Sequence, residues 1–276
     1  MFWFPLIVCF FLGLKPGMLQ FLESNCGRMD SRALQNTNSL AHIHEGPWMA
    51  YLHAGGKFHC GGSLINHRYV LTAYHCIQHG ETLSVRLGEY NTATYNDCNG
   101  NDCIPPYEEF QIDKAIRNKD YTRNNRFHDI ALIRLSRWVE YKAHIKPICL
   151  ITDKSLHSYI ESMQDFKATG WGSRTRGSPS RTLKSIPIHR LDRSECRNRY
   201  MVECGSGQIC VDHEPGVACG GDSGGPMGHM VRLGDQTVYV QVGIVSYGNP
   251  ECRSPSVFTD VMNHIDWIQM VIRRFP

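Results

Sequence analysis

Short apolar runs separated by turn-forming residues constrain the fold of this 276-residue chain more than any other feature of its sequence. Residues 83–87 alternate apolar and polar side chains, as half-buried strands do. Residues 130–135 and 238–245 are further runs rich in β-branched residues, and clusters of Gly, Asn and Asp bound them. Helical spacing of apolar residues occurs over a long stretch only from Asp260 onward, with Thr259 or Asp260 available as the cap. The pattern predicts an all-β domain with a C-terminal helix.

The twelve cysteines indicate an oxidising compartment, because none has the Cys-x-x-Cys spacing of a metal site. The apolar run Phe2–Leu14 has the length of a signal-peptide core and falls short of the roughly 20 residues that cross a bilayer. A buried N-terminal strand is the alternative interpretation. We expect residues 1–19 to be a signal peptide and the remaining chain to be secreted and extracellular, with no membrane attachment after its removal.

The charge and the histidine pattern exclude two classes of function. The formal net charge is +3 and no basic run occurs, which argues against a nucleic-acid partner. The fourteen histidines are scattered, without a His-x-x-x-His pair and an accompanying acid on a helix. We therefore expect no catalytic metal.

The hexapeptide Gly221-Asp222-Ser223-Gly224-Gly225-Pro226 is the sharpest chemical signal in the chain. Glycines on both sides of a serine let the backbone bend sharply and direct amide N–H groups toward one point. Such donors stabilise the charge that develops on the oxygen of an attacked carbonyl. A flexible Gly/Ser turn is the alternative, but the motif favours an enzyme.

Two further segments supply partners for a nucleophilic serine. His75 precedes Cys76 at the end of an apolar run, and Asp129 stands directly before the buried run 130–132. A buried carboxylate is costly unless it is paired, whereas a buried histidine could equally be a satisfied core residue. The occurrence of His, Asp and Ser in this order, each in such a setting, favours a catalytic triad.

These motifs, together with several shorter ones, identify a family. From about Pro47 to Ile272 the chain resembles the trypsin/chymotrypsin family of serine proteases, in particular secreted arthropod members. The resemblance implies two packed six-stranded antiparallel β-barrels followed by a C-terminal α-helix. It also implies a short propeptide and activation segment at residues 20–34 and the protease domain at 35–276. The matching segments are 47–50, 60–65, 72–76, 128–135, 170–172, 221–226 and 246–248.

The resemblance assigns a role to each residue of the motifs. Ser223 would attack the scissile carbonyl, His75 would accept its proton, and Asp129 would orient the imidazole. The backbone N–H groups of Gly221 and Ser223 would form the oxyanion hole. The segment Ser246–Gly248 would bind the substrate backbone as an added strand.

Val217 occupies the position that corresponds to the floor of the specificity pocket, where trypsin-like members carry aspartate. A substrate guanidinium above Val217 would remain unpaired, at a cost of several kcal/mol. Ser256 stands where wide-pocketed members have glycine, which predicts a shallower pocket. We expect cleavage after small or medium apolar side chains.

The family pattern also pairs the cysteines and leaves Cys204 alone. An odd thiol in a secreted protein indicates an intermolecular partner or a free reactive site, and a buried unpaired thiol is the alternative. The expected pairs are Cys26–Cys149, Cys60–Cys76, Cys98–Cys103, Cys196–Cys210 and Cys219–Cys252.

The loop around Cys98 and Cys103 is rich in acidic residues. A similar loop binds calcium in some family members, which makes Glu89 and Glu108 the candidate side-chain ligands of a structural calcium ion. Solvated acids on an exposed loop are the alternative, and no cofactor is required for the chemistry. The acids of this region are Glu89, Asp97, Asp102, Glu108 and Glu109.

The chain departs from the family pattern in three places. Tyr74 replaces the small residue that usually precedes the catalytic histidine, where it either crowds His75 or points elsewhere. A cysteine pair usual near residues 170–172 is absent, with Phe166 and His229 nearby.

The activation site is the third departure. Family members are cut before Ile-Val-Gly-Gly, and the freed amino group pairs with the aspartate that is Asp222 here. This chain lacks that sequence; Arg28–Met29 and Arg32–Ala33 are the candidate bonds.

The residues therefore predict a secreted serine endopeptidase, made as a zymogen, with protein or peptide substrates and an activating protease as partners. The alternative is a weakly active or non-catalytic homologue that binds proteases or their substrates. Such homologues usually lose a triad residue, and this chain retains all three.

Overall fold

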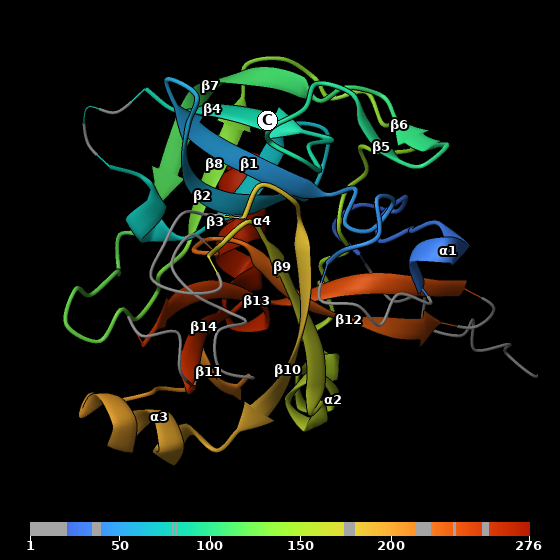
Figure 1. The fold of residues 1–276 in the computed structure, drawn as a ribbon. Coiled ribbons are helices and arrows are strands. Elements are labelled where there is room, and N and C mark those ends of the chain that lie inside the picture. Colours follow the sequence, from blue (N-terminus) through green and yellow to red (C-terminus); the bar gives the residue numbers. More distant parts are fainter. Residues whose placement is uncertain are drawn as a thin grey trace, which may run out of the picture.

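The computed structural model describes residues 21–34, 40–78, 80, 82–173, 180–213, 222–233, 236–249 and 254–276. Two closed antiparallel barrels form most of this part of the chain. Figure 1 shows the barrel from the first half of the chain, blue to green, above the barrel from the second half, yellow to red. The predicted signal peptide at 1–19, Val217 and Gly221 lie outside the described residues.

The first barrel has the strand order β1-β2-β3-β8-β7-β4. Its β4 shows the alternation that predicted it, with Val85 and Leu87 buried and Ser84 and Arg86 partly exposed. The strands are β1 (Met49–Ala54), β2 (Lys57–Leu64), β3 (Tyr69–Thr72), β4 (Ser84–Leu87), β7 (Glu108–Arg117) and β8 (Ala131–Leu135).

The second barrel has the strand order β10-β11-β14-β13-β12-β9. The β-branched run 238–245 lies in its longest strand, β13, which pairs with both β12 and β14. Two six-stranded antiparallel barrels are thereby confirmed. The strands are β9 (Asp165–Gly170), β10 (Lys184–Leu191), β11 (Gln208–Asp212), β12 (Pro226–Leu233), β13 (Gln236–Gly248) and β14 (Ser256–Asp260).

Short helices and one hairpin decorate the barrels. The hairpin pairs β5 (Asp97–Asn99) with β6 (Asp102–Ile104). None of the helices in the described ranges has the length and apolar character needed to cross a bilayer. The helices are α1 (Ser31–Leu34), α2 (His157–Ser162), α3 (Arg193–Tyr200), α4 (Ile265–Arg274) and the 3-10 turns Tyr74–Cys76, Lys154–Leu156 and Met262–His264.

The predicted C-terminal helix is α4, and Asp260 caps the turn before it. Its Oδ1 accepts the amide hydrogens of Met262 at 2.9 Å and Asn263 at 3.2 Å, which starts a 3-10 turn ahead of the α-helix. The chain end then returns to the first barrel, where Arg134 donates to the carbonyl of Pro276 at 2.9 Å.

Buried aromatic and polar contacts join the two barrels. Trp48 stacks on Tyr239 with ring centroids 4.8 Å apart, and both rings are buried. The Ser63 hydroxyl donates to Gln241 Oε1 at 2.6 Å, also without contact with solvent. Because these contacts fix one barrel against the other, side chains at the seam keep defined positions.

The disulfides agree with the family pattern wherever both cysteines are described. Cys60–Cys76 fixes the segment that carries His75, and the Cys219–Cys252 pair lies outside the described residues. Cys204 is a free, buried thiol, as the second interpretation of it predicted. The four confirmed pairs are Cys26–Cys149, Cys60–Cys76, Cys98–Cys103 and Cys196–Cys210.

Candidate active site

His75 and Asp129 meet at the seam between the barrels. His75 lies in the 3-10 turn that follows β3, and Asp129 lies two residues before β8, the strand that pairs with β3. Asp129 Oδ2 lies 2.8 Å from His75 Nδ1, and Asp129 Oδ1 accepts the backbone N–H of His75 at 3.0 Å. The carboxylate thus fixes both the ring and the backbone of the histidine.

The Asp129 carboxylate is completely buried, so hydrogen bonds are needed to stabilise its negative charge. Ser246 from β13 donates its hydroxyl to Asp129 Oδ2 at 2.5 Å. Thr259 from β14 donates to the Asp129 backbone carbonyl at 2.9 Å. With Nδ1–H of His75 directed at the carboxylate, Nε2 keeps its lone pair for accepting a proton.

Ser223 lies in a tight turn that opens β12. The N–H of Gly225 donates to the Asp222 carbonyl at 2.9 Å, and the N–H of Gly61 on β2 donates to the Ser223 carbonyl at 2.8 Å. Gly224 has φ of 78°, and a Cβ there would lie 2.2 Å from Thr72 Oγ1 and 3.1 Å from Cys76 Sγ. Only glycine fits this position, and the turn is held beside the cysteine that follows His75.

The residues expected to bind substrate are partly described. Gly248 of β13 pairs with Ser256 of β14, which places both on adjoining strands near Ser246. His213, at the end of β11, was not anticipated from the sequence: it is buried, and its Nε2 lies 2.9 Å from Ser256 Oγ. A lone histidine before the Gly-rich segment gave no signal of its own.

Asp222, the residue before the nucleophile, is also buried. Its Oδ1 accepts the N–H of Gly172 at 2.7 Å, and a Cβ on Gly172 would lie 2.2 Å from its Oδ2. The Nζ of Lys184, on β10, lies 4.0 Å from Asp222 Oδ2. Lys184 was not anticipated either, because nothing in the local sequence marks it as buried.

Two departures from the family pattern are accommodated by packing. The Tyr74 ring stacks on Tyr121 with centroids 4.0 Å apart, so it leaves the His75–Asp129 contact intact. Phe166 and His229, near the absent cysteine pair, meet edge to face at 6.3 Å.

The two candidate activation bonds differ in accessibility. Arg28 and Arg32 both have exposed side chains, but the Arg32–Ala33 bond lies within α1 and Ala33 is only 1% exposed. The Arg32 guanidinium pairs with Asp30 at 2.9 Å and with Asp102 of β6 at 2.7 Å. These contacts hold the Arg32 side chain against the β5–β6 hairpin.

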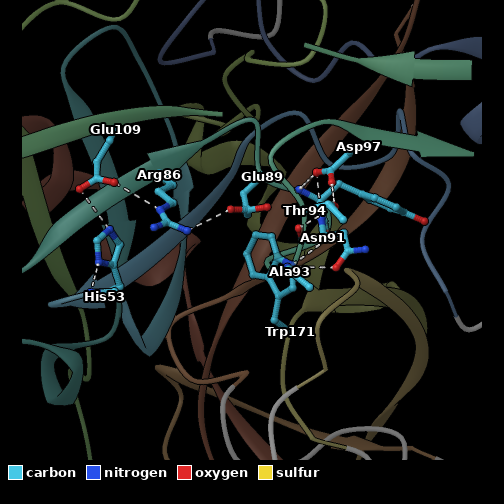
Figure 2. A network of polar contacts seen from close by, with 11 residues as sticks. His53, Arg86, Glu89, Asn91, Ala93, Thr94, Asp97, Glu109 and Trp171 are labelled. Atoms are coloured by element: carbon cyan, nitrogen blue, oxygen red, sulfur yellow. Dashed lines mark hydrogen bonds and ion pairs between the residues drawn. The ribbon is translucent and has the colours of Figure 1, made fainter. Parts of the chain in front are cut away.

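The acidic residues near the β5–β6 hairpin are paired by protein groups and not simply solvated. Figure 2 shows the Arg86 guanidinium between the carboxylates of Glu89 and Glu109, and His53 beside Glu109. Burial, and secondly the charge of Asp97, raises the pKa of Glu89 to about 7. Glu89 Oε1 is buried without a hydrogen-bond partner, an environment that a bound cation would relieve.

Glu108 Oε1 is also buried without hydrogen-bond geometry, but two cations lie beside this carboxylate. Arg137 lies 3.2 Å and Lys142 2.7 Å from its carboxylate, and together they lower its pKa despite partial burial. Within the described residues, the one convergent group of potential metal ligands is Cys60, His75 and Cys76, whose sulfurs form a disulfide. A calcium ion would therefore fit the Glu89 side of the loop better than Glu108.

Comparisons with known proteins agree with the fold and the motifs. The trypsin family model matches residues 36–268. Serine protease ea of Drosophila melanogaster is 35% identical over 277 aligned positions, covering 91% of this chain and 70% of that protein. The Spaetzle-processing enzyme of the same organism is 36% identical over 253 positions, covering 82% of this chain and 63% of that protein.

A solved structure extends the likeness to three dimensions. The crystal structure of the Drosophila Grass clip serine protease of the Toll pathway gives a TM-score of 0.79 at 33% identity, covering 94% of this chain and 76% of that one. With the family model matching most of the chain, and two six-stranded barrels placing His75 against Asp129 at their seam, this chain belongs to the trypsin/chymotrypsin family of serine endopeptidases.

Proposed function

We propose that this chain is a secreted serine endopeptidase, made as a zymogen, that uses Ser223, His75 and Asp129 as its catalytic triad. The observation that carries the proposal is the double contact of Asp129 with the ring and backbone of His75. This contact selects the imidazole tautomer whose Nε2 can act as a base.

The reaction proceeds through an acyl-enzyme. Ser223 Oγ attacks the scissile carbonyl while His75 Nε2 accepts the hydroxyl proton, and the carbonyl electron pair moves onto oxygen. The N–H groups of Gly221 and Ser223 stabilise this oxyanion. The oxyanion collapses, the C–N bond breaks, and His75 gives its proton to the leaving amine. Water then attacks the ester by the same route and releases Ser223.

The preferred substrates are peptide bonds after small or medium apolar side chains. Val217 at the pocket floor provides no counter-charge for arginine or lysine. Ser256, buried on β14 and bonded to His213, fills space that a glycine would leave open. Gly248 and Ser246 provide the strand along which the substrate backbone binds.

The partners are protein substrates and an activating protease. One relative is named for processing Spaetzle and another, from Spodoptera litura, for activating phenoloxidase, so both names describe action on other proteins. The cysteine-rich sequence and its apolar N-terminus support secretion.

A fluorophosphonate probe tests this function directly. The secreted chain is labelled before and after treatment with candidate activating proteases, with Ser223→Ala as the control. Labelling that depends on Ser223 is expected, and its absence under every treatment contradicts the proposal. Cleavage of a peptide library then tests the pocket, because dominant cleavage after arginine or lysine contradicts the assignment of Val217.

The alternative is a weakly active or non-catalytic homologue that binds other proteases or their substrates. It is favoured by one observation, the burial of Ala33 within α1, which disfavours cleavage at that bond. The same labelling experiment separates the two functions.

Structural calcium is a further part of the proposal, with Glu89 as its side-chain ligand. The buried Oε1 of Glu89 supports it. The ion would neutralise this carboxylate and would take no part in peptide hydrolysis.

A further inference from the structure

Two opposite charges are buried together beside the nucleophile turn. The Lys184 side chain is 3% exposed and that of Asp222 is 5% exposed, and Nζ lies 4.0 Å from Oδ2. Burying either charge alone is unfavourable, so each is retained only where the other or a strong donor compensates it.

Strand pairing and two glycines bring Lys184 and Asp222 together. Lys184 is the first residue of β10 and pairs with Gly170, the last residue of β9. A Cβ on Gly170 would lie 2.3 Å from Asp222 Oδ1, so the carboxylate reaches into the space that Gly170 and Gly172 leave free. The Gly172 N–H bonds Oδ1, and the Lys184 ammonium lies on the side of Oδ2.

The carboxylate position is linked to the nucleophile through one short turn. Asp222 directly precedes Ser223, and its carbonyl accepts the N–H of Gly225 across that turn. If the carboxylate left its buried site, the Asp222–Ser223 peptide would rotate with it. The Ser223 N–H, a proposed oxyanion donor, belongs to this peptide.

We infer that Lys184 is a positioning residue, whose ammonium holds the Asp222 carboxylate in its buried site and thereby keeps the Ser223 N–H aimed at the oxyanion before any activating cleavage. This inference rests on the proposed function. Lys184 supplies a positive charge to Asp222 from inside the folded chain. In other family members the amino group freed at the activation sequence supplies that charge, and this chain lacks that sequence. The uncleaved zymogen therefore has a basal Ser223-dependent activity, lower than that of the cleaved enzyme.

The segment that precedes the first barrel runs past the same lysine. Leu40 pairs with Lys184, and the Ala41 N–H donates to the Leu183 carbonyl at 3.0 Å. This contact covers the backbone of Lys184 without supplying a charge to Asp222. Among the described residues, the Lys184 ammonium is a cation that the structure places beside this carboxylate.

The test compares uncleaved chains that carry Lys184→Met, Lys184→Arg or, as a matched surface control, Lys57→Met. Lys57 is the exposed first residue of β2. Fluorophosphonate labelling and kcat should fall about tenfold or more in Lys184→Met, because one oxyanion donor is typically worth about 10²–10³ in kcat. KM should change little, Lys184→Arg should recover most of the rate, and Lys57→Met should match the wild-type chain.

Folding is checked by circular dichroism, and Lys184→Gln replaces Lys184→Met if the latter does not fold. A folded Lys184→Met or Lys184→Gln chain that labels at the wild-type rate overturns the inference. So does a fall in labelling that Lys184→Arg fails to recover while remaining folded. Wild-type chain that labels only after cleavage overturns the inference but leaves the proposed function intact, whereas wild-type chain that never labels contradicts the proposed function itself.

Discussion

The Ser246 hydroxyl donates to the same Oδ2 atom of Asp129 that faces His75 Nδ1. One carboxylate oxygen therefore contacts both a strand of the second barrel and a turn of the first barrel. The orientation of His75 therefore depends, through Asp129, on how β13 packs against the first barrel.

Replacing Ser246 by alanine should lower kcat by about 10- to 100-fold, since a hydrogen bond to a charged group contributes about 1.5–3 kcal/mol. Steady-state kinetics of the activated enzyme would measure the effect. Ser63→Ala is the matched control, because it removes another buried serine hydroxyl at the barrel seam that does not contact Asp129. Equal losses in both variants would show that the effect is one of packing.

Cys204 should resist alkylation in the folded protein. Burial raises the pKa of its thiol to about 11, so at about pH 8 roughly one molecule in a thousand carries the reactive thiolate. Mass spectrometry after iodoacetamide treatment should find Cys204 unmodified in native protein and modified after unfolding. Rapid native labelling, or a disulfide-linked dimer on a non-reducing gel, would contradict this.

Glu89 should make stability depend on pH near neutrality. Its folded-state pKa of about 7 exceeds the ordinary value of 4.5, so the folded protein binds this proton more tightly than the unfolded chain does. The resulting stabilisation is complete below the ordinary pKa and is lost as pH rises through 7. Calorimetry should show a falling Tm over this range in wild-type protein and a flatter profile in Glu89→Gln.

Calcium should oppose this loss. At about pH 8, where Glu89 is mostly ionised, millimolar calcium should raise the Tm of wild-type protein and leave Glu89→Gln unchanged. An equal shift in both proteins would place the ion elsewhere, and no shift in either would rule out the proposed site.

Limited trypsin digestion should cut Arg28–Met29 before Arg32–Ala33. Both arginines are exposed, but Arg32 pairs with Asp30 and Asp102 and the Ala33 that follows it is buried. Asp102→Asn should accelerate the second cut by about two- to fivefold, the range expected for one exposed ion pair. N-terminal sequencing of the fragments identifies the order, and Asp120→Asn provides an exposed control. First cleavage at Arg32 in wild-type protein would contradict the proposed protection.

The resemblance to the family, carried by motifs that are continuous in the chain, predicted the two-barrel architecture and the four disulfide pairs that the structure confirms. The alternation at 83–87 and the run at 238–245 became strands β4 and β13, since a half-buried pleated surface selects such patterns. Helix α4 was found, but its start was misplaced, because Asp260 caps a 3-10 turn before the α-helix begins.

Contacts between distant segments were harder to anticipate. In the sequence Lys184 looks like an ordinary strand lysine. Only the pairing of Lys184 with Gly170 in the folded sheet places its side chain beside Asp222. His213 and the pairing of Arg32 with Asp102 are likewise decided by tertiary packing. Local periodicity does not predict such tertiary contacts, because they depend on how distant segments pack in the folded protein.

The Cys26–Cys149 disulfide has a consequence for what activation releases. Cleavage at Arg28 or Arg32 divides the chain into two polypeptides, yet the shorter one remains covalently tethered to the barrel domain. Its local concentration stays in about the millimolar range, as for short flexible linkers. Cleavage therefore produces a two-chain molecule of nearly unchanged mass, and the severed segment remains close enough to rebind the surface it left.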